Sequence, residues 1–266
     1  MQNHKRKILL LVEGKSTEVK LFKKIIECFN EINVSEQDIL FYSTNLWVLN
    51  NDLKKEFGDN WYEEEIDFIG FLCSKSNIKS QILPISGQGQ VENFKNMKFT
   101  DVFLIFDYER QDPGFDESVI KKMLSFWNES TENGLLYINY PMVEAYKHLK
   151  AIPDNDYLTR QCDRTTLINH KYKELVGSES SFTDLKKYNR NLLKEFVIHN
   201  LCKASAITQG TTDISVSTAK KYWDSRDYNA ILDVQNQCSR NAATGFVHVL
   251  ATCLFFIPEY NSNLIF

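Results

Sequence analysis

The sequence lacks the features that mark membrane, secreted and zinc-binding proteins. No run in it approaches the roughly 20 apolar residues of a transmembrane helix, and the apolar run at 8–12 is too short for a secretory signal core. The six cysteines stand singly, without a Cys-x-x-Cys pair that would indicate a zinc site, and they suggest no disulfide framework. We therefore expect a cytoplasmic protein with reduced thiols and no membrane association.

Positive charge is also scarce, because 31 Lys and Arg stand against 35 Asp and Glu, a formal net charge of −4. This balance excludes a generically basic nucleic-acid binder. The excess of acid lies in residues 1–150, which hold 18 Lys and Arg against 23 Asp and Glu, whereas residues 151–266 hold 13 against 12. If nucleic acid is the substrate, a local basic patch, metal ions or a partner must offset this charge.

What the sequence does contain is an apolar strand pattern that runs directly into acid, and it contains this twice. The apolar residues 8–12 are followed by Glu13. The apolar residues 102–106 are followed by Asp107 and then, one residue further on, by Glu109. In open α/β sheets, ligands bind outside the carboxyl ends of the strands, where such side chains can converge. Carboxylates in that place suggest a divalent-metal site, and hence phosphoryl-transfer chemistry.

Strand and helix patterns alternate over the first 150 residues. Strands are expected at 8–12, 39–42, 78–85, 102–106 and 135–139. Helical spacing fills the intervals between them, most clearly at 46–57. This alternation predicts an α/β fold, with a mostly parallel sheet flanked by helices.

Strand patterns become rare beyond residue 150. Helices are expected instead, at 183–202, 219–234 and 245–256. We therefore expect two domains, a catalytic α/β domain at 1–150 and a mainly helical region at 151–266 that binds substrate or a partner.

The order of these motifs resembles that of a Toprim domain, which occurs in topoisomerases, primases, OLD-family nucleases and small ribosomal RNA maturases. The matching segments are Val-Glu-Gly-Lys-Ser-Thr-Glu at 12–18, Pro-Ile-Ser-Gly-Gln-Gly at 84–89 and Asp-Tyr-Glu at 107–109. The resemblance covers residues 8–140, with an insertion at about 35–75. Topoisomerases and primases usually carry Asp-x-Asp where this chain has Glu109, and no catalytic tyrosine can be assigned. The resemblance therefore favours a small, OLD-like nuclease.

That resemblance implies an endonuclease that hydrolyses phosphodiester bonds in DNA or RNA, tRNA included, with one or two Mg²⁺ or Mn²⁺ ions. Many Toprim nucleases act in antiphage defence beside an ATPase. The partners to expect are thus nucleic acid, an ATPase partner protein and further copies of the chain, and the role to expect is that of a phage-defence effector.

Five residues near the first and third motifs are candidates for the chemistry. Glu13, Asp107 and Glu109 are the expected metal ligands and catalytic acids. Lys15 is a candidate catalytic residue that would contact phosphate as a point charge, although an ordinary surface lysine fits it as well. Glu18 could serve a second metal, or it could be a solvated acid that the dipole of its helix favours.

Further candidates lie beyond the last expected strand. Glu144 is either an additional metal ligand or an acid at a helix N-terminus, and Lys147 beside it could contact nucleic acid. A basic face on the expected helix at 183–202 is another place for nucleic acid, with a merely solvated face as the alternative. Its members are Lys186, Lys187, Arg190 and Lys194.

Three functions compete. A metal-dependent nuclease is the leading one, and a Toprim-like regulatory or binding subunit with little or no catalysis is the alternative, in which the acids bind metal only structurally. A nucleotidyl transferase is the third. The run at 14–16, Gly-Lys-Ser, resembles the end of a nucleotide-binding P-loop, but Leu9 stands where that motif needs its first glycine.

Overall fold

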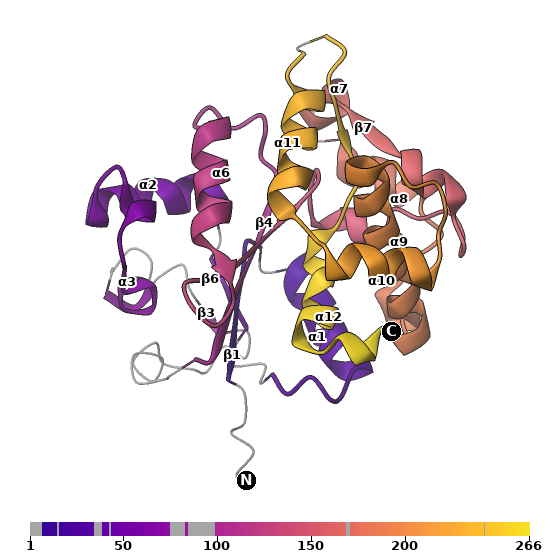
Figure 1. Ribbon diagram of the computed structural model, residues 1–266, viewed down its shortest axis with the longest axis horizontal. Coiled ribbons are helices and arrows are strands. Elements are labelled where there is room, and N and C mark those ends of the chain that lie inside the picture. The colour runs from indigo at the N-terminus through magenta and orange to yellow at the C-terminus, as the bar shows by residue number, and fades with distance from the viewer. Residues whose placement is uncertain are drawn as a thin grey trace. The chain divides into compact units, whose positions relative to one another are not determined.

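The computed structural model describes residues 7–14, 16–34, 39–42, 44–74, 83–84, 99–168, 171–241 and 243–266. The chain divides into two compact units (Figure 1). Unit 1 comprises Met1–Phe106 and Ser118–Tyr137, and unit 2 comprises Asp107–Glu117 and Ile138–Phe266. The chain thus passes from one unit to the other at the Asp-x-Glu motif. A boundary between independently folding domains near residue 150 stays a prediction.

A six-stranded sheet forms the centre of unit 1, in the order β3-β2-β1-β4-β6-β5. Its strands are β1 (Ile8–Val12), β2 (Ile39–Phe41), β3 (Leu83–Pro84), β4 (Asp101–Asp107), β5 (Asn128–Glu129) and β6 (Gly134–Asn139). Strand β1 pairs in parallel with β2 and with β4, while β3 runs antiparallel to β2 and β5 antiparallel to β6. Every residue of β1, β4 and β6 is buried, as expected of strands covered on both faces. The predicted mostly parallel sheet is confirmed.

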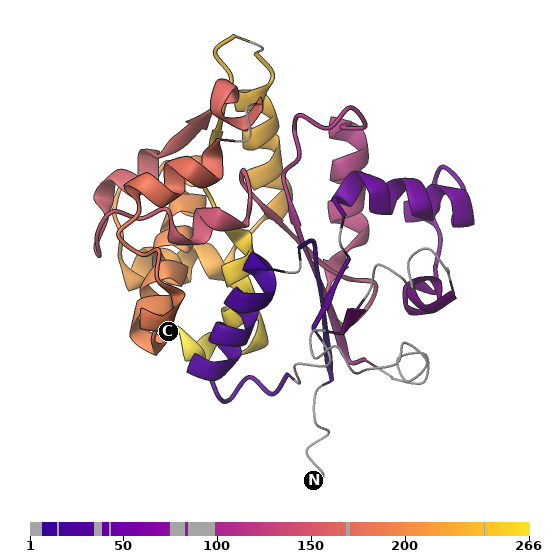
Figure 2. The same ribbon diagram turned by 180° about the vertical axis from the view of Figure 1, so that it is seen from behind.

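Helices cover both faces of this sheet (Figure 2). Helix α1 (Thr17–Cys28) lies on one face, and α2 (Leu46–Phe57), α3 (Phe68–Ser74) and α6 (Glu117–Phe126) lie on the other. Helix α2 has the bounds predicted for it, because Asn45 caps its start, accepting hydrogen bonds from the amides of Trp47 and Val48, and Gly58 ends it with φ of 94°.

The segment predicted as an insertion, 35–75, contains part of the sheet itself. Strand β2 pairs with β1, so it is a central strand of the fold. The rest of the segment that the structure describes forms α2, a 3₁₀ turn at Trp61–Glu63 and α3. The Trp61 ring is fully buried, 4.9 Å from the Trp127 ring between centroids, and its indole donates a hydrogen bond to the Asn50 side chain. These contacts make α2 and the turn part of one core with α6.

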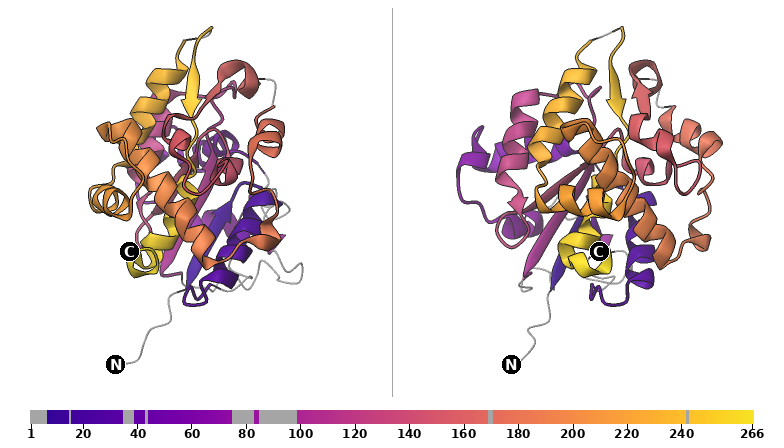
Figure 3. Two further views of the ribbon diagram at one scale, coloured as in Figure 1. Left: turned by 90° about the vertical axis from the view of Figure 1, so that its right-hand side faces the viewer. Right: turned by 45° about the vertical axis from the view of Figure 1, so that its right-hand side comes forward.

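Unit 2 is largely helical, as predicted for the C-terminal region. Its helices are α7 (Arg164–Ile168), α8 (Tyr172–Glu179), α9 (Arg190–Gln209), α10 (Val216–Asp224), α11 (Tyr228–Ser239) and α12 (Phe256–Tyr260). Helix α9 packs against α10 and α11, and Figure 3 shows it among them. A short antiparallel ribbon of β7 (Gln161–Asp163) and β8 (Phe246–His248) accompanies the helices. No helix in the described part of the chain is both long and apolar enough to cross a membrane.

Three expectations for this unit are wrong in detail. The helix expected at 183–202 is α9, which begins only at Arg190, because Asn189 caps it by accepting a hydrogen bond from the Leu192 amide. The helix expected at 219–234 is two helices, since Asp227 caps α11 through the amides of Asn229 and Ala230. The segment 245–256 holds strand β8, a 3₁₀ turn at Thr252–Phe255 and the first residue of α12.

Helix α9 buries polar side chains as well as apolar ones. Leu193, Phe196, Val197 and Leu201 are buried. Lys203 is also fully buried, and its ammonium donates to the carbonyls of Leu158 and Arg160 at 2.7 and 2.9 Å. Burial, with the nearby Arg160 guanidinium as a smaller cause, lowers the pKa of Lys203 to about 7. The Lys203 ammonium thus joins the helix to the 3₁₀ turn at Asn155–Thr159 and to the residue that precedes β7.

Candidate functional site

The two strands that lead into the acid motifs are neighbours in the sheet. Strand β1 pairs in parallel with β4, with Val12 opposite Ile105. The Glu13 amide extends the pairing by donating to the Ile105 carbonyl at 3.1 Å. Glu13 therefore stands directly beyond a paired strand end, in unit 1, and Asp107 follows Ile105 by two residues. The predicted strand placement of both motifs is confirmed up to this point.

A buried carboxylate fixes the turn that carries Glu13. The Glu18 side chain, only 6% exposed, accepts a hydrogen bond from the Gly14 amide at 3.1 Å. A Cβ on residue 14 would lie 2.8 Å from one Glu18 carboxylate oxygen, so a larger residue there would require the Glu18 side chain to shift. The bond ties the first turn of α1 back to the end of β1. Glu18 thus has a positioning role that the sequence did not indicate, and its role as a metal ligand stays a prediction.

Two substitutions at Glu18 separate these roles. Glu18→Gln keeps an oxygen that can accept from the Gly14 amide, and it removes the charge that a metal would need. If Glu18 only positions the turn, Glu18→Gln should retain metal affinity within about 3-fold, while Glu18→Ala should lower the unfolding midpoint, consistent with a loss of about 1–2 kcal/mol. Calorimetric titration with Mn²⁺ and urea unfolding of both variants measure this. A loss of metal affinity in Glu18→Gln as large as in Glu18→Ala would instead make Glu18 a ligand.

In unit 2, Asp107 is held by two donors. The residue is 5% exposed. Its Oδ1 accepts a hydrogen bond from the Val143 amide at 2.8 Å and another from the Asn139 side-chain amide at 3.3 Å. Asn139 is itself fixed, because its Oδ1 accepts from the Cys253 amide at 3.1 Å. The Tyr108 amide donates to the Asn139 carbonyl at 2.9 Å. The Asn139 side chain at the end of β6 and the Val143 amide beyond it therefore hold the Asp107 carboxylate in one orientation.

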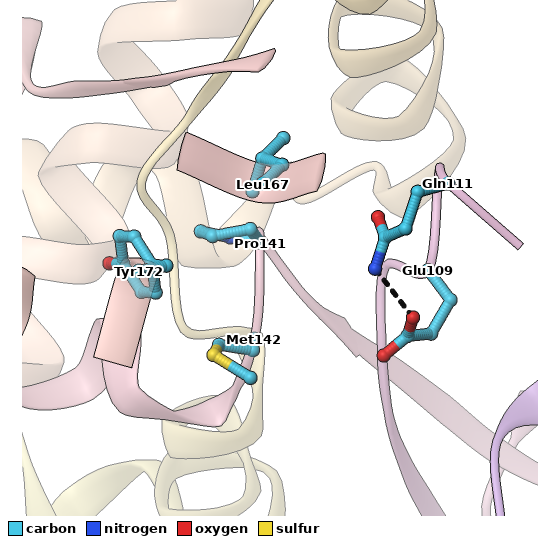
Figure 4. A pocket seen from close by; sticks show the side chains of 6 residues that line it. All are labelled: Glu109, Gln111, Pro141, Met142, Leu167 and Tyr172. Atoms are coloured by element: carbon cyan, nitrogen blue, oxygen red, sulfur yellow. Dashed lines mark hydrogen bonds between the residues drawn. The ribbon is translucent and has the colours of Figure 1, made fainter. Parts of the chain in front are cut away.

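Glu109 lies at the edge of a small cavity in unit 2 (Figure 4). The residues lining the cavity are Glu109, Gln111, Pro141, Met142, Leu167 and Tyr172. The Gln111 side-chain amide donates to the Glu109 carboxylate at 2.7 Å. Figure 4 shows these two side chains on one side and the apolar Pro141, Met142 and Tyr172 on the other. The acid thus meets a mostly apolar hollow, with the Gln111 amide as its hydrogen-bond donor.

A buried hydrogen-bond chain leads away from the cavity. The Tyr172 hydroxyl lies 3.0 Å from His148 Nδ1, and His148 Nε2 lies 3.1 Å from the Glu179 carboxylate. Burial lowers the pKa of His148 and so favours the neutral ring, while the hydrogen bond to Glu179 opposes that shift. Because a carboxylate only accepts, Nε2 carries the proton and Nδ1 accepts from the tyrosine. Nothing in the sequence indicates this chain, since His148 is 24 residues from Tyr172 and 31 residues from Glu179.

Glu144 and Lys147 lie on the 3₁₀ turn Val143–Lys147, directly after Val143 binds Asp107. The Glu144 side chain is buried and pairs with the Lys173 ammonium at 2.9 Å. Burial lowers the pKa of Lys147, with Glu144 opposing the shift. The placement beyond β6 agrees with the prediction. The ion pair with Lys173 is a structural role for Glu144, and its role as a metal ligand stays a prediction.

The predicted basic helical face is not one face of a helix. Lys186 and Lys187 lie on the 3₁₀ turn Leu185–Lys187, which Asp184 caps through the Lys186 amide, whereas Arg190 and Lys194 lie on α9. Residues 188–189 separate the two elements in extended backbone conformation. The regular helical spacing that suggested the face is therefore broken, and a nucleic-acid contact by these four residues stays a prediction.

The convergence of the acids on a metal also stays a prediction. Glu13 belongs to unit 1, and Asp107 and Glu109 belong to unit 2. Among the described residues, no three His, Cys, Asp or Glu side chains gather as a metal-holding group. The available donors fit Mg²⁺ or Mn²⁺, because they are carboxylate oxygens and Asp107 is oriented by its hydrogen bonds. Lys15 and most of the motif at 84–89 lie outside the described residues.

Comparison with known proteins found no match to the chain among protein-family models, curated proteins or solved structures.

Proposed function

We propose that the protein is a metal-dependent nuclease of the Toprim type, which hydrolyses phosphodiester bonds in DNA or RNA. The observation that carries the proposal is the register of β1 and β4, two parallel neighbours that each run into an acidic motif. The carboxyl end of a parallel sheet is where the ligands of open α/β proteins bind. The residues that come next along the chain, Glu13 on one strand and Asp107 on the other, are carboxylates.

The proposed ligands are Glu13, Asp107 and Glu109. A bound Mg²⁺ or Mn²⁺ would neutralise charge at the phosphoryl group and lower the pKa of a water molecule. The chain's own contribution is orientation. The donors from Val143 and Asn139 fix Asp107, and the contact of Glu18 with Gly14 fixes the turn after β1. Glu109 is the second residue after Asp107 in the sequence. Lys15, three residues after the end of β1 in the sequence, would contact phosphate.

The competing proposal is a regulatory or binding subunit in which the same acids serve only structure. The hydrogen bonds to Asp107 favour the nuclease, because the Val143 amide and the Asn139 side chain both donate to Oδ1 and orient the carboxylate as a metal-binding carboxylate would be. We further propose that the nuclease acts in the cytoplasm as a phage-defence effector, with an ATPase as its partner. These last points rest on the resemblance of the motifs alone.

The purified chain, incubated with Mg²⁺ or Mn²⁺ and with labelled duplex DNA, single-stranded DNA, RNA and tRNA, tests the proposal. The expected result is that at least one substrate is cleaved and that EDTA abolishes this cleavage. Protein carrying Asp107→Asn, prepared in parallel, controls for a contaminating nuclease. Metal-dependent incorporation of nucleoside triphosphates without cleavage would favour the transferase. Metal binding without either reaction, tested also with an ATPase encoded beside the gene, would favour the regulatory subunit.

A further inference from the structure

Three arginines meet at the C-terminal end of α11 in unit 2. The Arg110 Nε donates to the Ser239 hydroxyl at 3.2 Å, and Arg164 approaches the Ser239 carbonyl at 3.5 Å. Arg240 is the next residue after Ser239. These residues come from three separate parts of the chain, so the sequence could not show that they gather. We call Arg110, Arg164 and Arg240 the arginine cluster.

Glu117 is the acid that forms ion pairs with the cluster. Arg240 donates to the Glu117 carboxylate at 2.7 Å, and Arg110 lies 3.5 Å from the same group. Arg164 forms no ion pair with any described residue. The neighbouring Asp163 is engaged in capping α7, since its carboxylate accepts from the amide and the hydroxyl of Thr166. The three arginines and Glu117 together have a formal charge of +2, and two further acids, Asp163 beside Arg164 and Asp233 near Arg240, offset part of it.

The guanidinium groups are held in place and remain accessible. The Arg110 side chain lies over the Phe115 ring, 4.3 Å from the ring centre, and is 23% exposed. The Arg240 side chain is 64% exposed. A planar guanidinium that is fixed on one side and open on the other suits phosphate, which it can contact with two parallel N–H groups.

The acidic motif at 107–109 is joined to the arginine cluster through Tyr108 and Arg110. The buried Tyr108 hydroxyl donates to the Asn236 side chain at 2.6 Å and lies 3.2 Å from the Ser239 hydroxyl. Tyr108 is the residue between Asp107 and Glu109, and Arg110 follows Glu109 directly. The backbone that carries Asp107 and Glu109 is thus the backbone that places Arg110 at the cluster.

We propose that the arginine cluster is the site where the phosphodiester backbone of a nucleic acid binds, a few residues from the acids that act on it. It would supply the local basic patch that a chain with a net charge of −4 needs. The inference rests on the proposed nuclease function for the identity of the ligand. The chemistry it recognises, a polyanionic backbone of phosphodiesters, is common to DNA and RNA.

Binding in EDTA tests the cluster apart from catalysis. Fluorescence anisotropy with labelled single-stranded DNA, duplex DNA and RNA, from 50 to 300 mM KCl, gives the affinity and its salt dependence. The variant Arg164→Gln/Arg240→Gln should weaken binding about 10-fold at low salt and reduce the slope of log K against log salt by about 0.7 per lost contact on single strands, or about 0.9 on duplex. Glu117→Gln should have the opposite effect, tightening binding and steepening the slope.

The matched control is Lys220→Gln/Lys221→Gln, which removes the same charge from exposed positions on α10 of unit 2. An unchanged affinity and slope in this control, together with the changes above, supports the cluster. If wild-type protein binds none of the probes in EDTA, if the arginine variant keeps the wild-type slope, or if only the lysine variant weakens binding, the inference is overturned. Absence of metal-dependent cleavage alongside salt-dependent binding through the cluster would instead count against the nuclease and leave the binding site standing.

Discussion

Asp107→Asn is expected to lower metal-dependent cleavage about 100-fold or more while leaving the protein folded. Asparagine keeps an oxygen in the place of Oδ1, so it can still accept from the Val143 amide and the Asn139 side chain. It removes the negative charge that binds and orients the metal. Initial cleavage rates at saturating Mg²⁺, with urea unfolding as the test of folding, measure the effect.

Asparagine is the sharper substitution because alanine would disturb the fold as well. Asp107→Ala leaves the buried donors from Val143 and Asn139 without their acceptor, at a cost of about 1–3 kcal/mol each. Asp156→Asn is the matched control, an exposed acid in the same unit that loses the same charge. Full cleavage by Asp107→Asn at ordinary Mg²⁺ concentrations would remove Asp107 from the proposed metal site and, with it, the nuclease proposal.

The strands that lead to the acids could be predicted because buried parallel strands are continuous apolar runs. Residues 8–12 became β1 with the predicted bounds, and the acid that follows stood out because a charged side chain breaks the run. The partners of these acids could not be predicted in the same way. Glu18 looked like an ordinary helix acid, and its contact with Gly14 depends on how the turn between them bends. The partners of Asp107 come from the end of β6 and from the turn after it, 32 and 36 residues along the chain.

For the basic residues, too, local sequence patterns did not predict which side chains gather. Lys186, Lys187, Arg190 and Lys194 are close in sequence, so regular spacing made them look like one helical face, and a single capping residue, Asn189, was enough to break it. The arginine cluster is dispersed along the chain and meets only through the folding of unit 2. Local patterns indicate which residues could act, whereas long-range hydrogen bonds decide which of them act together.

Helix α9 is a further example, because its apolar stripe was predictable and its buried amide was not. Asn200 is fully buried, and its side-chain oxygen accepts from the Tyr157 hydroxyl at 2.8 Å and from the Ala251 amide at 2.7 Å. Its amide nitrogen donates to the Phe196 carbonyl at 2.8 Å. One side chain thus joins the helix to the 3₁₀ turn at Asn155–Thr159 and to the backbone just before the turn at Thr252–Phe255.

Asn200→Ala is therefore expected to destabilise the protein by about 3–5 kcal/mol, a large part of the stability of an ordinary domain. The substitution leaves two buried donors without an acceptor and opens a cavity beside the helix. The free energy of unfolding from urea titration measures it, with Asn191→Ala, exposed on the same helix, expected to stay within about 0.5 kcal/mol of wild type. Adding Tyr157→Phe to Asn200→Ala removes one of the orphaned donors, so the double variant should lose less than the sum of the two single losses. Strict additivity, or a loss below about 1 kcal/mol for Asn200→Ala, would mean that this amide does not hold unit 2 together.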